Sequence, residues 1–272
     1  MKVKKLLRVL AICAALFLVL IILSVIFSFK GNPISAWRAT TDIKTYVKNY
    51  YPDLDAEVSE ASYNFKFSMY TSTVKARTSK DTYFHVDWRK GKIYDNYEHE
   101  VANRFTTYSR LQKEFETEVE KILKEEFPHE HTLLIAEICK DEDTMKELTL
   151  DMELDVHHPP RQTSLTLWVV SDDLSPEYMR DRLLEIHQLL KEHDIPMDGY
   201  SLRLQKGTYD EQGEFITEDD AHCYDFPAEK IEEPGLLEAI VENQRLMDEE
   251  DRKSKAAEEA ATAEKLEQER AN

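Results

Sequence analysis

Glycine is scarce in this chain, and its scarcity excludes several common binding sites. The 272 residues contain only six glycines, and no two of them have the spacing of a phosphate-binding loop or of a nucleophile elbow. Such loops need glycine because their backbone must turn sharply or approach the ligand closely. The sequence therefore predicts no nucleotide bound by these routes, and we expect no cofactor.

Cysteine is rare as well. The chain contains three, and only Cys139 and Cys223 lie outside the apolar N-terminal run. Two cysteines cannot build a disulfide framework, although a single bridge between them stays open. We expect two buried, reduced thiols, because a cysteine without a disulfide is usually buried like a small apolar residue.

Basic residues are also few beyond the N-terminus. After residue 8 the chain has 31 Lys and Arg against 54 Asp and Glu, which gives a net charge of −23. A protein that binds nucleic acid needs a basic surface to displace counterions, and this sequence has no basic stripe. The acidic surface would also repel anionic headgroups and wall polymers. The charge therefore predicts no nucleic-acid partner and a soluble surface.

One long stretch without charge stands out at the N-terminus. Residues 9–29 form a run of 21 uncharged residues between Arg8 and Lys30. A helix of this length spans roughly 30 Å, the hydrocarbon thickness of a bilayer, whereas a cleaved signal peptide has an apolar region of only about 7 to 15 residues. Bulky residues, Phe27 and Phe29, stand where a cleavage site would need small ones. We therefore expect a retained transmembrane helix, a signal-anchor, over residues 9–29.

The charges around this run predict its orientation. Residues 1–8 carry four cations, which favours a cytoplasmic N-terminus. Lys30, Arg38 and Lys44 follow the run and reduce this bias. The predicted location is the cell membrane, with a single pass through the lipid bilayer at residues 9–29 and the following domains extracytoplasmic.

The region 30–104 has the pattern of an N-terminal α+β domain, in which one helix covers one face of an antiparallel sheet. A turn at residues 31–33 is expected to end the membrane helix, and a second helix is expected over 41–52. Alternating apolar and polar residues predict strands over 61–70 and 82–88, followed by a glycine hairpin turn into a further strand. The side chains of the first strand that would face the core are Tyr63, Phe65 and Phe67.

The region 105–230 has the pattern of a C-terminal α+β domain, again with helices on an antiparallel sheet. It starts with a long amphipathic helix that ends at Pro128. The apolar residues in phase on this helix are Leu111, Phe115, Val119 and Ile122. Strands are predicted over 132–138, 148–157 and 163–170, with the last two joined as a hairpin.

The remainder of this domain and the tail follow the same logic. Ser175 and Pro176 predict the start of a helix, because Ser caps a helix and Pro is accommodated at its first position. Its apolar face would comprise Met179, Leu183, Ile186 and Leu190. Two more strands with a turn between them follow. Residues 231–272 form an acidic tail, which is helix-prone from 249 to 270 because it is rich in Ala, Glu and Lys. A solvated helix or a partner-binding arm would explain the tail.

Histidines supply the candidates for a metal site. His129 and His131 flank one glutamate, and His157 and His158 are adjacent in a loop. Alternate residues of an extended segment project to the same side, so a pair could offer two of the four ligands that zinc takes. The missing ligands could come from carboxylates such as Asp155 and Glu137. Exposed loop histidines without a metal are the simpler interpretation, and we expect no metal.

A ladder of carboxylates at Asp151, Glu153 and Asp155 lies in one of the predicted strands. Calcium needs oxygen ligands wrapped around it, and a straight strand cannot wrap an ion. The ladder therefore predicts a solvated sheet face rather than a cation site or a catalytic pair.

Five short segments carry a resemblance to a known family. They are FSFKGNPIS at 27–35, YYPDLDAEVSEASYNFK at 50–66, GKIYDNYE at 91–98, KEEFP at 124–128 and DIPMDGYSLRL at 194–204. With them, the chain up to about residue 226 resembles the YfjL-like family of small membrane-anchored proteins from Gram-positive bacteria. The resemblance implies an N-terminal and a C-terminal α+β domain outside the cell, behind one transmembrane helix. It implies no activity and assigns no catalytic residues.

The sequence contains no catalytic constellation, so we expect a protein that is not an enzyme. The favoured function is that of an envelope module that binds another protein or a peptide, with exposed sheet edges that could accept an extended peptide. Two alternatives stay open. One is a metal-dependent envelope hydrolase that would use His129, His131 or His157, and the other is a structural spacer.

Overall fold

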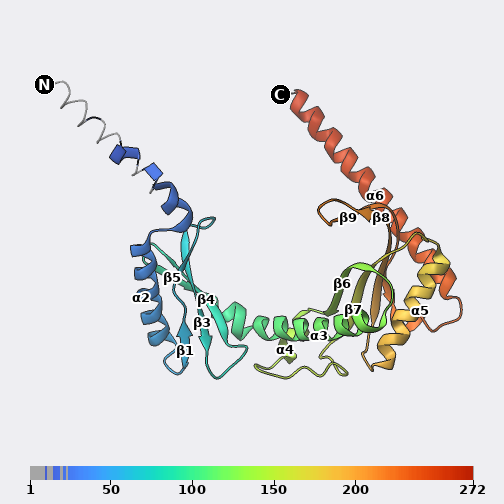
Figure 1. Ribbon diagram of the computed structural model, residues 1–272, viewed down its shortest axis with the longest axis horizontal. Helices are drawn as coiled ribbons and strands as arrows, with labels where there is room; N and C mark the ends of the chain where they lie inside the picture. The colour runs from blue at the N-terminus through green and yellow to red at the C-terminus, as the bar shows by residue number, and fades with distance from the viewer. Residues whose placement is uncertain (1–9, 11–14, 19–20, 23, 272) are drawn as a thin grey trace. The chain divides into compact units, whose positions relative to one another are not determined.

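The computed structural model describes residues 10, 15–18, 21–22 and 24–271 (Figure 1). The chain divides into two compact units. The first unit extends to Arg110 and also includes Leu148–Met152, and the second comprises Leu111–Glu147 and the residues from Glu153 onward. Each unit contains one β-sheet with helices packed on it. The predicted α+β class is therefore confirmed.

The prediction of a transmembrane helix over residues 9–29 is wrong for the described chain. No helix among the described residues is both long and apolar enough to cross a membrane. Residues 9, 11–14, 19–20 and 23 lie outside the described residues. The predicted single-pass membrane location depends on this helix and is wrong for the same reason.

The first unit begins with helix α2 (Pro33–Tyr50). Gly31, with φ of 74°, ends the preceding helical stretch, and the Asn32 side chain then accepts a hydrogen bond from the Ile34 N–H at 2.8 Å. This cap and the proline at the first helical position start the helix eight residues before the predicted start at Thr41. Gly31 and Pro33 indicate the end of one helix, but the same residues also start the next one, which the sequence pattern alone does not distinguish.

Helix α2 lies along one face of an antiparallel sheet (Figure 1). The strands are β1 (Ala56–Val58), β2 (Ser62–Asn64), β3 (Met69–Ala76), β4 (Tyr83–Arg89) and β5 (Lys92–Asp95). Their order is β1-β3-β4-β5, and β2 also pairs with β3. The buried core between helix and sheet includes Ile43, Val74, Phe84 and Val86. A short π-helix (Glu98–Ala102) follows the last strand.

One predicted strand of this unit is wrong. Residues 61–70 do not form a continuous strand, because the chain reverses between β2 and β3, and Ser68 adopts a φ of 51° in the turn. Phe65 and Phe67 lie at this reversal with 52% and 61% of their surface exposed, so they are not core residues. The alternation of apolar residues continued through a turn that only tertiary pairing reveals.

The second unit contains a four-stranded sheet and four helices. Its elements are α3 (Phe105–Glu126), which begins in the first unit, β6 (His131–Ile138), α4 (Glu142–Glu147), β7 (Thr163–Val170), α5 (Pro176–Glu192), β8 (Gly199–Tyr209), β9 (Phe215–Pro227), a 3-10 turn (Ala228–Lys230) and α6 (Leu236–Ala271). The sheet order is β6-β7-β8-β9. The predicted in-phase residues of α3 and α5 are all buried, and the predicted helix of the tail is confirmed as part of α6.

The predicted fully antiparallel sheet of this unit is wrong. β7 pairs with β8 in parallel, while the other two pairs are antiparallel. The two strands run in parallel because α5 connects them: the helix brings the chain back to the end of the sheet where β7 began, and β8 starts from there. The sheet is therefore mixed, and β7 is not the second arm of a hairpin.

The predicted strand over residues 148–157 is also wrong. This segment has turns and no strand, and Asp151 adopts a φ of 62°. The carboxylate ladder therefore does not lie on a sheet face. Leu150 instead packs against the core of the first unit, which explains why the segment contains alternating apolar residues without pairing as a strand.

The cysteines confirm one expectation and correct another. Both Cys139 and Cys223 are thiols and not disulfide-bonded, as expected. Cys223 is buried in β9, and this burial raises its pKa to about 12. Cys139 is exposed, contrary to the expectation, because it follows the last residue of β6.

Candidate functional site

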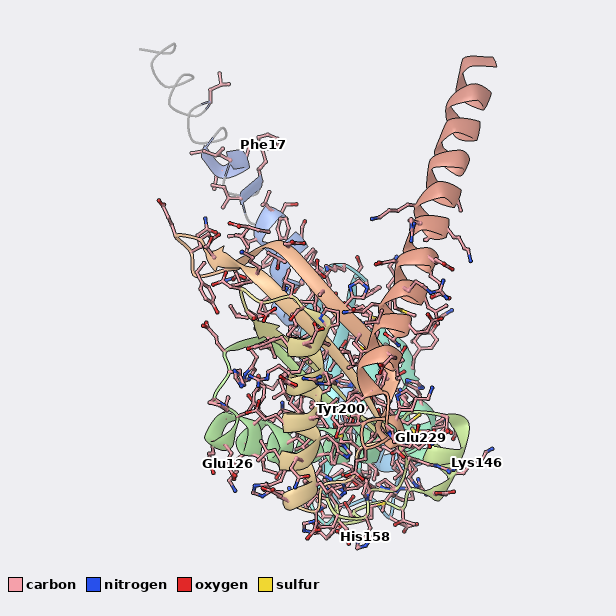
Figure 2. The ribbon with its side chains drawn as sticks, turned by 90° about the vertical axis from the view of Figure 1, so that its right-hand side faces the viewer. Phe17, Glu126, Lys146, His158, Tyr200 and Glu229 are labelled. Carbon is pink, nitrogen blue, oxygen red and sulfur yellow. The ribbon has the colours of Figure 1, made fainter. Side chains whose placement is uncertain are left out.

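A cavity lies within the second unit. Its volume is about 740 Å³, which lies in the range of roughly 300 to 1,000 Å³ found for ligand sites. It is lined by His157, His158, His187, Lys191, Asp194, Ile195, Pro196, Met197, Tyr200, Ala228, Glu229 and Glu232. Figure 2 labels His158, Tyr200 and Glu229, which come from three different segments of the chain.

The end of α5 forms one wall of this cavity. The helix ends at Glu192, and Asp194 adopts a φ of 53° that turns the chain back toward the sheet. The Ile195 N–H then donates to the Leu190 carbonyl at 2.9 Å, which closes the helix end. This turn places Ile195 against the core at 4% exposure and directs the following residues into β8. Ile195 and the buried Tyr200 and Ala228 give the cavity an apolar floor.

His187 is the central polar group. Its Nδ1 lies 3.1 Å from the Tyr200 hydroxyl, and the two rings meet edge to face with 5.7 Å between their centroids. Its Nε2 lies 3.6 Å from a carboxylate oxygen of Glu232, which also forms a close ion pair with Lys191. A phenol, an imidazole, a carboxylate and an ammonium group are therefore arranged in a row along one side of the cavity.

Burial determines the protonation states in this row. Burial lowers the pKa of His187, and the Lys191 charge adds to the effect while Glu232 opposes it. Burial also raises the pKa of Tyr200 well above its ordinary value. The Lys191 ammonium lowers the pKa of Glu232. At neutral pH the row therefore consists of a neutral phenol, a neutral imidazole and an ion pair, and Tyr200 is not ionised for nucleophilic attack.

The histidine pair predicted at 157 and 158 lies at this cavity. The His157 Nδ1 lies 3.1 Å from the Asp194 carbonyl oxygen and so donates to it, and the His157 backbone N–H donates to Asp155 at 3.0 Å. The His158 Nδ1 lies 3.0 Å from the other oxygen of the same carboxylate. Asp155 thus holds the loop that carries both imidazoles, a role the carboxylate-ladder interpretation did not foresee.

The other predicted pair, His129 and His131, lies at the start of β6 and away from this cavity, where His129 contacts side chains of α5. The His129 ring lies 3.0 Å from Glu185 and 2.5 Å from an Arg182 nitrogen. The His131 Nδ1 lies 3.2 Å from the His129 carbonyl oxygen, so it donates to the backbone. Among the described residues no group of three or more His, Cys, Asp or Glu side chains is arranged to hold a metal ion.

Sequence reasoning missed the residues at the centre of the site, namely His187, Lys191, Tyr200, Glu229 and Glu232. His187 and Lys191 are one helical turn apart on α5, so they lie on the same face. That spacing was the available signal. The meeting of α5 with Tyr200 and with the segment after β9 depends on the sheet order, which the sequence did not predict.

A second hollow of about 480 Å³ lies on the sheet face that α5 does not cover. Arg203 of β8 stacks over the Trp168 ring at 4.9 Å and pairs with Asp220 of β9 at 2.9 Å. These side chains already bind each other across the strands. This sheet face therefore offers a ligand fewer polar groups than the cavity beside α5 does.

Both edges of this sheet are covered by carboxamides. On β6, the Gln112 side chain donates to the Ala136 carbonyl and accepts from the Ile138 N–H, each at 2.7 Å. On β9, Asn243 of α6 accepts from the Tyr224 N–H at 3.2 Å and donates to its carbonyl at 2.9 Å. At these positions the edges resemble paired strands, which disfavours the predicted addition of a peptide strand there.

Comparison with known proteins matches both parts of the chain to family models. A model described as the YfjL-like N-terminal domain matches residues 4–97, and one described as the YfjL-like C-terminal domain matches residues 114–241. The second match contains every residue that lines the cavity. No curated protein and no solved structure matches the chain.

Proposed function

Because the chain belongs to the YfjL-like family and its C-terminal domain carries this cavity, we propose that it is a non-enzymatic protein that binds a segment of another protein or a peptide. The cavity receives one side chain of that segment. The single observation that carries the proposal is the cavity itself, with its apolar floor and polar rim.

The composition of the cavity supports binding of a peptide segment. Protein interfaces have an apolar centre from which charges are depleted and a rim that is polar and solvated. Here Ile195, Tyr200 and Ala228 form the buried centre, and charged residues such as Glu229 and Lys191 surround it. A side chain inserted from a bound peptide would bury apolar surface at the centre while the peptide backbone stays near the rim.

The chemistry of the lining supports binding rather than catalysis. Nucleophilic catalysis needs a nucleophile next to a base that activates it. The lining contains no Ser, Thr or Cys, and its buried Tyr200 is held protonated. Lys191 is tied to Glu232 by an ion pair. No observation in the described residues favours a metal-dependent hydrolase or a structural spacer over binding.

Selection from a displayed library of random peptides, with the full chain as bait, tests the proposal. Selected peptides are then measured by fluorescence anisotropy against two variants. Met197→Trp fills the cavity from its lining, whereas Leu184→Trp adds the same bulk at an exposed position of α5 outside it. We expect the first variant to weaken binding at least tenfold and the second to leave it unchanged. A library that yields no binder, or binders indifferent to Met197→Trp, would contradict the proposal.

A further inference from the structure

The two units differ greatly in charge. The second unit contains 18 Lys and Arg against 43 Asp and Glu, a net charge of −25, whereas the first contains 17 against 11, a net charge of +6. Together they give the −19 of the whole chain. All of the excess negative charge therefore belongs to the unit that carries the cavity, and that unit attracts cations over long range at low salt.

The cavity shows the same imbalance locally. Asp194, Glu229 and Glu232 supply three carboxylates, and Lys191 supplies the one ammonium group. Lys191 is paired with Glu232, so its charge is already neutralised. The Asp194 and Glu229 carboxylates make no hydrogen bond or ion pair with any described side chain. With histidines counted as neutral, the lining carries a net charge of −2.

We infer that the side chain taken by the cavity is that of a lysine or an arginine. This inference rests on the proposed function, because it names the ligand class of the same site. The aliphatic stem of such a side chain packs against Ile195, Met197 and Ala228, as long cationic side chains do on apolar surfaces. Its charged head then reaches Glu229 at the rim and forms a charge-assisted hydrogen bond.

Other side chains fit the same lining less well. An acidic side chain would meet two carboxylates without cationic partners, and the one ammonium group is already engaged. An apolar side chain would satisfy the floor but would cover Glu229 without giving it a partner, and desolvation of an unpaired charge is costly. A cationic head on an apolar stem satisfies both the floor and the rim.

The test uses the peptide that binds most tightly in the selection described above, measured on the full chain. Each lysine or arginine in it is replaced in turn by norleucine, which keeps the stem and removes the charge. We expect one replacement to weaken binding at least tenfold. The same replacement should have less than threefold effect on the Glu229→Gln variant, because the carboxylate that recognises the charge is then absent.

A matched variant controls for general loss of negative charge. Glu233→Gln removes one carboxylate from an exposed position four residues away that does not line the cavity. We expect this variant to keep the full preference for the cationic peptide. Glu229 is itself exposed, so its replacement by Gln is expected to leave the fold intact, which circular dichroism checks.

The possible failures are distinguishable. If Met197→Trp abolishes binding but the norleucine peptides bind as tightly as their parent, the cavity binds peptides and the inference of a cationic side chain is overturned. The same conclusion follows if Glu233→Gln removes the preference as fully as Glu229→Gln does. If no selected peptide depends on Met197, the proposed function fails together with the inference.

Discussion

Asp81 and Asp151 hold each other by reciprocal hydrogen bonds. The Asp81 N–H donates to the Asp151 carboxylate at 3.0 Å, and the Asp151 N–H donates to the Asp81 carboxylate at 2.8 Å. Arg110 completes the arrangement with two hydrogen bonds to Asp81, at 2.6 and 2.9 Å, and a third to the Met152 carbonyl. These bonds attach the segment Leu148–Met152 to the first unit.

We predict that Asp81→Asn destabilises the first unit by about 3 kcal/mol. The Asp81 side chain is fully buried, so the variant removes the carboxylate that accepts two hydrogen bonds from the Arg110 guanidinium, a change that costs about 3 to 5 kcal/mol in comparable buried pairs. Hydrogen exchange followed by mass spectrometry measures this loss of stability in the first unit separately, because a chain of two units need not unfold in one step. Exchange in β3 and β4 should accelerate. The exposed Asp53→Asn is the control, and equal exchange in both variants would contradict the prediction.

The same carboxylate predicts a dependence of stability on pH. Burial by itself would raise the pKa of Asp81, but Arg110 and the Asp151 N–H outweigh it and hold the pKa below its ordinary 3.8. A carboxyl with a lowered folded pKa stabilises the fold fully above its unfolded pKa and loses this contribution as the pH falls through the folded value. The stability difference between wild type and Asp81→Asn should therefore be constant from pH 5 to 7 and should shrink below about pH 4. Hydrogen exchange of β3 and β4 in increasing urea, repeated across this pH range, measures the stability of the first unit, and a difference that grows on acidification would refute the assignment.

Local signals in the sequence predicted what local physics determines. Ser175 caps α5 and Pro176 starts it, as expected, because capping involves only neighbouring residues. The prediction of a strand over residues 148–157 failed because the conformation of this segment depends on Asp81, which is 70 residues away from Asp151. Its alternation of apolar residues had no partner strand to form a sheet with.

In the candidate site, too, the features that depend on neighbouring residues were predictable and those that depend on distant contacts were not. The sequence identified His157 and His158 as unusual, and both lie at the cavity. It gave no indication that His187 meets Tyr200, because that contact requires α5 to cross over to a parallel strand. A helical position next to the core residue Ile186 is not distinctive until the neighbouring strand is known.

We predict that Gln112→Ala opens the edge of β6. The variant removes both hydrogen bonds that its carboxamide makes with the strand, at Ala136 and Ile138, at a cost of about 1 to 3 kcal/mol. Backbone amides near Ile138 should exchange faster, whereas those of β8, in the middle of the sheet, should change little. Glu125→Ala, an exposed change on the same helix, is the control. Unchanged exchange at Ile138 would show that another group can cover this edge.

We also expect Gln112→Ala to aggregate more readily, because an uncovered edge pairs with other chains.

The last prediction separates two reasons for glycine in the β8–β9 hairpin. A Cβ at Gly207 would lie 2.0 Å from the Ile216 carbonyl oxygen, at a shift in the strand register, so an alanine there must push two paired backbones apart. A Cβ at Gly213 meets nothing within 4 Å, and the only obstacle is its φ of 83°. We therefore expect Gly207→Ala to cost about 3 kcal/mol or more, as overpacking against a rigid neighbour does, and Gly213→Ala to cost about 1 kcal/mol from backbone strain alone. Hydrogen exchange in β8 and β9 measures both. If the two variants are equally destabilised, the close strand contact at Gly207 costs no more than backbone strain does at Gly213, and the steric argument at Gly207 is wrong.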